Sequence, residues 1–276
     1  MSRRVAGRIG INLAGLFVFV VMVFPVYWMV ATSFKEGHNI LSDTPQFFPS
    51  PVTLSNFDDA IHRAFFWDVV KNSLLIVGAV VGFSIVVGFL AALALAKFRF
   101  YGRGAFIVLI LGVQMVPLNA LIIPLYIQLS RAGLTNELSG VIITYLTFVL
   151  PFTVWTLRGF LLGIPRELEE AAMVDGSTRF GAFVRILLPL VAPGLVATSI
   201  FAFIQVWNEF IIAYVLLQSQ DKQTLPVWLA SFTTLRGTEW GPLMAAATLT
   251  ALPVVFFFVL IHRRIAFGLT AGAVRG

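Results

Sequence analysis

The chain has 276 residues, of which 59% are hydrophobic and only 12% charged, and its mean hydropathy is +0.93. A soluble domain of this length could not bury so much apolar surface, so lipid must cover part of the chain. The chain has no cysteine, which excludes disulfides, thiolate metal sites and cysteine nucleophiles. Its net charge of +6 comes from basic residues scattered around apolar stretches, which fits a membrane protein better than a nucleic-acid-binding one.

Six segments are long and apolar enough to cross a bilayer as helices, and they predict an all-α, polytopic membrane protein of one domain over residues 1–276. A hydrocarbon core of about 30 Å needs roughly 20 helical residues. Each segment is apolar around its whole circumference, as in helices packed within a membrane bundle. The first is too long for a signal-peptide core, so we interpret it as a retained span. The predicted spans cover residues 9–31, 70–96, 104–129, 138–162, 190–217 and 242–262.

The distribution of basic residues between alternate loops predicts the orientation, because cytoplasmic loops carry an excess of Lys and Arg. One side holds thirteen: Arg3, Arg4, Arg8, Lys97, Arg99, Arg103, Arg158, Arg166, Arg179, Arg185, Arg263, Arg264 and Arg275. The other side holds six: Lys35, Arg63, Lys71, Arg131, Lys222 and Arg236. We therefore expect both termini in the cytoplasm, and the long proline-containing loop 32–69 to form an external cap.

Two polar side chains interrupt the third predicted span, Gln114 and Asn119. They could line a route for polyhydroxyl substrates. Hydrogen bonding between helices is the commoner role of such residues in membranes. Both interpretations stay open.

A charged segment, "RELEEAAMVDGSTRFGAFVRILLP" (166–189), separates the fourth and fifth predicted spans on the cytoplasmic side. The preceding Pro165 suits the first turn of a helix, where its missing N–H would be unpaired anyway. Three acids, Glu167, Glu169 and Glu170, then stand where the helix dipole favours negative charge. The segment therefore predicts a short helix directly after the fourth span.

The second half of this segment predicts a tight turn and another short helix. Gly176 fits the left-handed position that ends a helix, Ser177 can cap the next one, and Pro189 is expected to close it. Such a helical hairpin could rest on the lipid surface. Alternatively, the small face formed by Leu168, Ala171 and Ala172 could dock into the groove of a partner protein.

The fifth predicted span contains an acid, Glu209, with Gln205 one turn before it and Asn208 beside it. An ionisable group in lipid is costly and usually faces the bundle interior or a water-filled cavity. Glu209 could serve as a pathway or gate residue. It could equally form a structural hydrogen bond to a partner permease or a neighbouring helix.

No stretch of the chain carries the chemistry of an enzyme. The G-x-x-x-x-G-K-[ST] pattern of a phosphate-binding loop is missing, so ATP-driven work would need another polypeptide. The three histidines are far apart, which makes a metal site improbable, and no nucleophile–base pair is evident.

The charged segment resembles the EAA loop of ABC-importer permeases. The family pattern is E-A-A, three residues, G, nine residues and I-x-L-P, and positions 170 to 189 match all of it. The resemblance implies a type I importer permease fold in which this loop is a coupling helix seated in a cleft of the ATPase. The implied ATPase contact comprises Glu170, Ala171, Ala172, Asp175 and Gly176.

Two further stretches, "FIQVWNEFIIAYVLL" (203–217) and "FGLTAGAVRG" (267–276), resemble maltose-type carbohydrate permeases, and the tail implies a second ATPase contact. The resemblance implies a multi-pass protein of the bacterial inner membrane that binds no cofactor itself. The implied partners are a second permease in a heterodimer, two cytoplasmic ATPase subunits that use ATP and Mg, and an extracytoplasmic substrate-binding protein.

Two alternatives to a sugar importer stay open. The same machinery could carry a polyol or a glycerophosphodiester, because cargo choice rests largely with the other subunits. An ion- or proton-coupled secondary transporter would instead use Glu209 as a proton carrier and would need no nucleotide.

Overall fold

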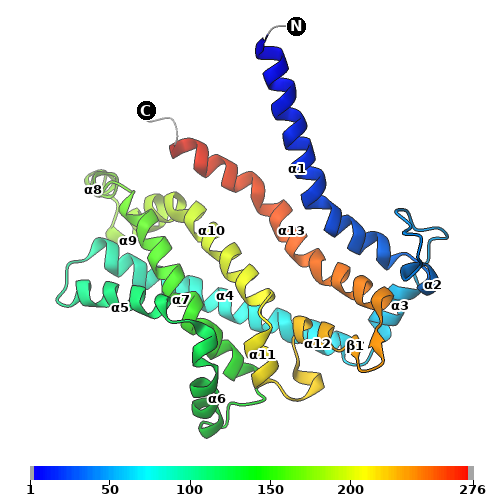
Figure 1. Cartoon of the computed structure of the whole chain (residues 1–276). Helices are drawn as coiled ribbons and strands as arrows, with labels where there is room; N and C mark the ends of the chain where they lie inside the picture. The colour runs from blue at the N-terminus through cyan, green and yellow to red at the C-terminus, as the bar shows by residue number, and fades with distance from the viewer. Residues whose placement is uncertain (1–2, 273–276) are drawn as a thin grey trace. The chain divides into compact units, whose positions relative to one another are not determined.

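The computed structural model describes residues 3–272, with side chains between residues 10 and 259 (Figure 1). The side chains of the tail at 267–276, and with them its predicted ATPase contact, lie outside the described residues. The described chain is mostly helical and divides into two compact units.

The first unit comprises residues 3–67 and 228–252. It contains the long helix α1, two short helices, a two-stranded antiparallel hairpin, and the portions of α4, α12 and α13 that lie in this residue range. The bounds are α1 Arg3–Ser33, α2 Gly37–Ile40, α3 Ser55–His62, α4 Phe66–Lys97, α12 Leu225–Ala230, β1 Thr233–Thr234, β2 Gly237–Thr238 and α13 Trp240–Gly272.

Buried polar contacts hold this unit together. The Asn56 amide on α3 donates to the carbonyls of Ser33 (3.0 Å) and Lys35 (2.7 Å), which fixes α3 against the end of α1. The Lys35 residue is only 2% exposed, with its ammonium 3.9 Å from the centre of the Trp28 ring. Burial lowers the pKa of Lys35, because desolvation disfavours the charged form.

The second unit comprises residues 68–227 and 253–272, with the remainder of α4 and α13. Its helices α7 and α10 run side by side, and α8 and α9 lie at one end of this pair (Figure 1). The bounds are α5 Arg103–Met115, η1 Leu118–Leu121, α6 Ile122–Arg131, α7 Leu138–Leu162, α8 Glu167–Val174, α9 Arg179–Ala182, η2 Phe183–Leu187, α10 Leu188–Trp207, α11 Ile211–Leu216 and η3 Gln220–Lys222.

The core of the second unit lies where α4, α5, α7, η2 and the start of α10 meet. Its buried members are Phe89, Ala92, Leu95, Ala96, Ile110, Val154, Leu157, Leu161, Leu187 and Val191. The approach of α7 to α10 depends on Gly194, because a Cβ at this position would lie 2.6 Å from the Phe160 ring. A small residue at such a crossing lets two membrane helices pack closely.

Five helices of the described chain are long and apolar enough to cross a membrane, and a bent pair makes a sixth if it counts as one span. The predicted spans 9–31, 70–96, 138–162 and 242–262 each fall within one continuous helix.

The third predicted span, 104–129, is instead broken. Its halves, Arg103–Met115 and Leu118–Arg131, meet at 89°. The break follows from Pro117, because a residue before proline is driven out of the helical region. Val116 accordingly has an extended ψ of 122°.

Candidate functional site

The charged segment forms the predicted helical hairpin, and its turn is stabilised by local backbone contacts. Gly176 has a φ of +88°, the left-handed conformation expected of it. Its N–H donates to the carbonyl of Met173 at 3.1 Å, and the N–H of Ser177 donates to that of Ala172 at 2.9 Å. These two bonds constitute a Schellman motif, which satisfies the last carbonyls of α8.

The second helix begins one residue later than predicted. Thr178, rather than Ser177, is the N-cap, and its hydroxyl accepts from the N–H of Gly181 at 3.0 Å. Ser177 belongs to the end of α8, because its N–H donates to the Ala172 carbonyl. Thr178 has the extended backbone, with a ψ of 163°, that is typical of an N-cap.

The expected break at Pro189 is absent, and this part of the prediction was wrong. Helical structure runs from Arg179 through Trp207, with a π-helical turn at Phe183–Leu187 just before the proline. The N–H of Leu188 donates to the carbonyl of Phe183, five residues back. This wider turn accommodates a ring that lacks an N–H and would otherwise clash with the preceding turn.

The hairpin presents an exposed surface that combines apolar and acidic groups. Val174 is 87% exposed, Phe180 75% and Val184 40%, whereas Leu187, at the end of the π-helical turn, is buried in the core. Of the predicted ATPase contacts, Ala172 is half-buried and the others are exposed: Glu170, Ala171, Asp175 and Gly176. We refer to these residues with Val174, Phe180 and Val184 as the hairpin surface.

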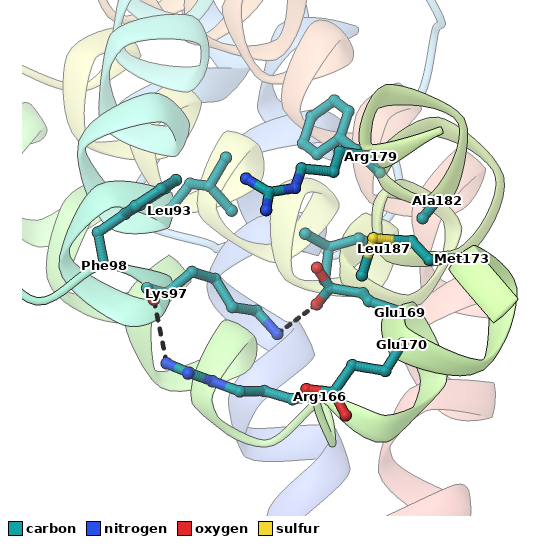
Figure 2. Close-up of a pocket in the computed structure, with 11 residues that line it drawn as sticks. Leu93, Lys97, Phe98, Arg166, Glu169, Glu170, Met173, Arg179, Ala182 and Leu187 are labelled. Carbon is teal, nitrogen blue, oxygen red and sulfur yellow. Dashed lines mark hydrogen bonds and ion pairs between the residues drawn. The ribbon is translucent and has the colours of Figure 1, made fainter. Parts of the chain in front are cut away.

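Beside the hairpin surface lies a pocket of ≈ 420 Å³ between the end of α4 and the α8–η2 segment (Figure 2). Apolar side chains of these elements share its lining with five charged residues: Lys97, Arg166, Glu169, Glu170 and Arg179. Within the described chain, neither the Glu170 carboxylate nor the Arg179 guanidinium forms a hydrogen bond or ion pair, and Figure 2 shows both without a partner.

Two polar contacts across this pocket were not predicted from the sequence. The Lys97 ammonium lies 2.5 Å from Glu169 Oε1, and these side chains are only 12% and 24% exposed. The Arg166 guanidinium donates to the Lys97 carbonyl at 3.0 Å. The partners lie about seventy residues apart, and no spacing rule links residues at that separation.

The fifth predicted span, 190–217, is interrupted after Trp207, and Glu209 stabilises the interruption. Its carboxylate accepts from the Tyr145 hydroxyl of α7 at 2.6 Å. It also accepts from the N–H groups of Ile212 (2.9 Å) and Ala213 (3.2 Å), which begin α11. These contacts match a structural hydrogen bond to a neighbouring helix. A pathway role for Glu209 stays a prediction.

The other predicted pathway residues are exposed amides at helix breaks or beside them. Gln114 and Asn119 flank the break at Pro117, while Gln205 and Asn208 flank the end of α10. The Asn208 amide donates to the carbonyl of Ile204 in its own helix at 2.8 Å. Among the described residues, no hydrogen bond joins either amide at the Pro117 break to Gln205, Asn208 or Glu209, and no cluster of three potential metal ligands occurs.

Comparison with known proteins finds a family model that matches most of the chain and relatives that match all of it. Residues 84–270 match the family model "Binding-protein-dependent transport system inner membrane component". The chain is 45% identical, over all 276 residues and the whole length of the relative, to the diacetylchitobiose uptake system permease protein DasC of Streptomyces coelicolor. It is 32% identical, again over both full lengths, to the trehalose/maltose transport system permease protein MalG of Thermococcus litoralis.

A solved structure has the same architecture. A chain from a bacterial ABC transporter involved in import of the acidic polysaccharide alginate superimposes with a TM-score of 0.80. The match covers 95% of this chain and 98% of that one at 23% identity. At this identity the likeness shows the fold alone.

Proposed function

The chain belongs to the inner-membrane components of binding-protein-dependent transport systems, and from this premise we propose that it is the permease half of an ABC importer for sugars or oligosaccharides. The relatives named above carry diacetylchitobiose and trehalose or maltose, two classes of glycan, and they match the chain end to end. Their names favour a sugar over a polyol or a glycerophosphodiester. The family assignment favours an ATP-driven importer over an ion-coupled carrier.

We further propose that the hairpin surface is the docking site for a cytoplasmic ATPase subunit. The observation that carries this proposal is that the hairpin exposes two large apolar side chains, Val174 and Phe180, and also an acid, Glu170, that has no partner in the described chain. Exposed apolar patches bordered by polar groups mark interaction sites. A protein partner fits better than a membrane surface, because α8 carries three acids and no Lys or Arg. Helices that lie on anionic lipid are rich in Lys and Arg.

The remaining partners follow from the same proposal. A second permease completes the pathway as a heterodimer, two ATPase subunits hydrolyse ATP with Mg, and an extracytoplasmic binding protein delivers the substrate. The chain itself binds no nucleotide and has both termini in the cytoplasm, in agreement with its excess of basic residues on that side.

For the substrate route, we propose that exposed amides offer hydrogen bonds to hydroxyl groups. The candidates are Gln114, Asn119, Gln205 and Asn208, with Glu209 maintaining the bend at which the last two lie. Polar groups in a span that are not used to bond helices together face the interior or a water-filled cavity.

Reconstitution of the complete importer tests the docking proposal. E170K reverses a charge on the hairpin surface, and G176P distorts the turn that presents it. Both variants should abolish uptake and stimulation of the ATPase while leaving membrane insertion intact. Normal uptake and normal ATPase association in a double variant at Glu170 and Ala171 would contradict the docking assignment.

Two further measurements address cargo and energy source. Binding of a sugar panel to the companion binding protein should identify the glycan. Gradient-driven uptake by this chain alone in liposomes without nucleotide would refute the importer assignment.

A further inference from the structure

We propose that Lys97, Glu169 and Arg166 form a two-point latch that fastens α8 to the end of α4, so that α4 moves with α8 during transport. We call these three residues the α4–α8 latch. The inference rests on the proposed function, since it concerns how displacement of a docked α8 reaches a membrane helix. These residues are positioning residues and lie beside the hairpin surface.

The first attachment is the ion pair between Lys97 and Glu169. The atoms are 2.5 Å apart, and the two side chains are 12% and 24% exposed. Ion pairs in water contribute little, because solvent screens them. A pair sheltered to this extent is different, since removal of one partner leaves the other charge without compensation in a poorly solvated place.

The second attachment joins the same two helices through a different atom. Arg166 is the N-cap of α8, and it donates to the carbonyl of Lys97, the last residue of α4. A cation is favourable at a helix C-terminus, where carbonyls lack partners within the helix. Arg166 and Glu169 are three residues apart, so α8 is attached to α4 along its first turn. Two attachments fix orientation as well as distance, whereas one would allow rotation.

The latch supplies a link that apolar packing does not provide. No residue of α8 is buried, and its apolar side chains Leu168, Met173 and Val174 are all exposed. By contrast, α4 supplies Phe89, Ala92 and Leu95 to the core of its unit. Close-packed protein interiors move as rigid bodies rather than deforming continuously. A displacement of α8 would therefore carry the end of α4, and with it the core that α4 shares with α7 and η2.

The charge arrangement in the pocket separates the latch from the docking site. Glu169 points toward Lys97, whereas the neighbouring Glu170 has no partner in the chain as described (Figure 2). The two adjacent acids thus have different contacts. Glu169 binds Lys97 within the chain, and Glu170 is available to bind the ATPase. A substitution at one can be compared directly with a substitution at the other.

The test uses the assembled importer with its second permease, ATPase subunits and binding protein. In K97M and E169Q, we expect uptake per ATP hydrolysed to fall about tenfold, within the range of ordinary coupling energies between sites. The ATPase subunits should still co-purify, because the hairpin surface is unchanged. The reversed pair K97E/E169K should recover uptake to within about threefold of the original, since it restores the paired contact.

Exposed neighbours provide matched controls. R99M removes a cation two residues after Lys97, and E167Q neutralises an acid two residues before Glu169. Both side chains are exposed and unpaired in the described structure, so uptake per ATP should not change. Unchanged uptake per ATP in both K97M and E169Q, or a reversed pair no better than the single variants, would overturn the latch.

A distance measurement provides a readout that a merely stabilising contact would not affect. The chain has no cysteine, so spin labels attach only at introduced sites, and Leu90 on α4 and Glu167 on α8 are exposed. The distance between these labels should stay the same with and without ATP, and should become ATP-dependent in K97M. An ATP-dependent distance with the latch intact would refute the proposal, even if the single variants fail to fold.

Failure of the proposed function would look different. If the ATPase subunits do not associate with the unsubstituted chain, or E170K transports normally, the docking assignment is wrong. Where the ATPase subunits do associate, the label distance in the unsubstituted importer still reports whether α8 and α4 move together, whatever E170K does.

Discussion

Two glutamates close to helix starts, Glu170 in α8 and Glu209 before α11, show how one residue type serves opposite purposes. The Glu209 carboxylate accepts three hydrogen bonds from its own chain, two of them from the N–H groups that open α11. The Glu170 carboxylate is exposed and has no such partner among the described side chains. The first acid stabilises a break within a span, and the second is available to another protein. Substitutions at each should therefore fail in different assays.

The largest effect on stability is expected from E209L. The substitution leaves the buried Tyr145 hydroxyl and two N–H groups without an acceptor, and each such group costs about 1–3 kcal/mol. Partners found in the unfolded membrane state reduce these costs, so we expect a loss of about 3 kcal/mol in total. Thermal unfolding of the purified chain in detergent measures it.

N208A is the matched control for E209L. Among the residues that the structure describes, the Asn208 amide bonds only the carbonyl of Ile204 in its own helix, and Asn208 is exposed. Its melting temperature should stay near that of the unsubstituted chain. Equal destabilisation by both variants would show that loss of any polar side chain at the break destabilises the chain. It would contradict a specific stabilising role for the Glu209 carboxylate.

The sequence predicted features that depend on neighbouring residues better than those that depend on distant ones. The turn at Gly176 and the acids at the start of α8 act locally, so the hairpin was predictable, apart from an error of one residue at the cap and the wrongly predicted helix end at Pro189. The interruption at Glu209 depends on Tyr145, which lies 64 residues earlier in the sequence. Lys97 and its partner Glu169 are separated in the sequence by α5, η1, α6 and α7. Those partners are brought together only by packing of α4, α7 and α10.

The break at Pro117 is an intermediate case. Its cause is local, because proline restricts the residue before it. Yet membrane helices often tolerate proline as a kink, since neighbouring groups satisfy the freed carbonyls. Hydropathy alone therefore could not distinguish a bend of 89° from a continuous span over 104–129.

A smaller effect, about 1.5 kcal/mol, is expected from G176A, because a side chain in the left-handed conformation is strained. No atom lies within 4 Å of the added Cβ, so the cost is conformational rather than steric. G112A in α5 also has open space and lacks the positive φ, so it should not destabilise the chain. Equal melting temperatures for the two variants would mean that the hairpin turn is dispensable.

T178A should cost about 1 kcal/mol, because it removes the hydroxyl that caps the second helix of the hairpin. T178S keeps the hydroxyl and should restore most of the loss. Hydrogen exchange at the Gly181 amide measures the cap directly, with faster exchange expected in T178A alone. Identical exchange in both variants would show that the cap does not form in the membrane.

The smallest effect on stability, and the sharpest test of the comparison, is expected from E170Q. The substitution removes the charge of an exposed side chain that no described residue contacts, so the melting temperature should not change. Association with the ATPase subunits should nevertheless weaken, because the partner loses a charged contact that the permease does not use itself. E209Q should show the reverse, a lower melting temperature with association intact in whatever fraction remains folded. If E170Q instead destabilised the isolated chain, its carboxylate would belong to the fold, and the distinction between the two acids would disappear.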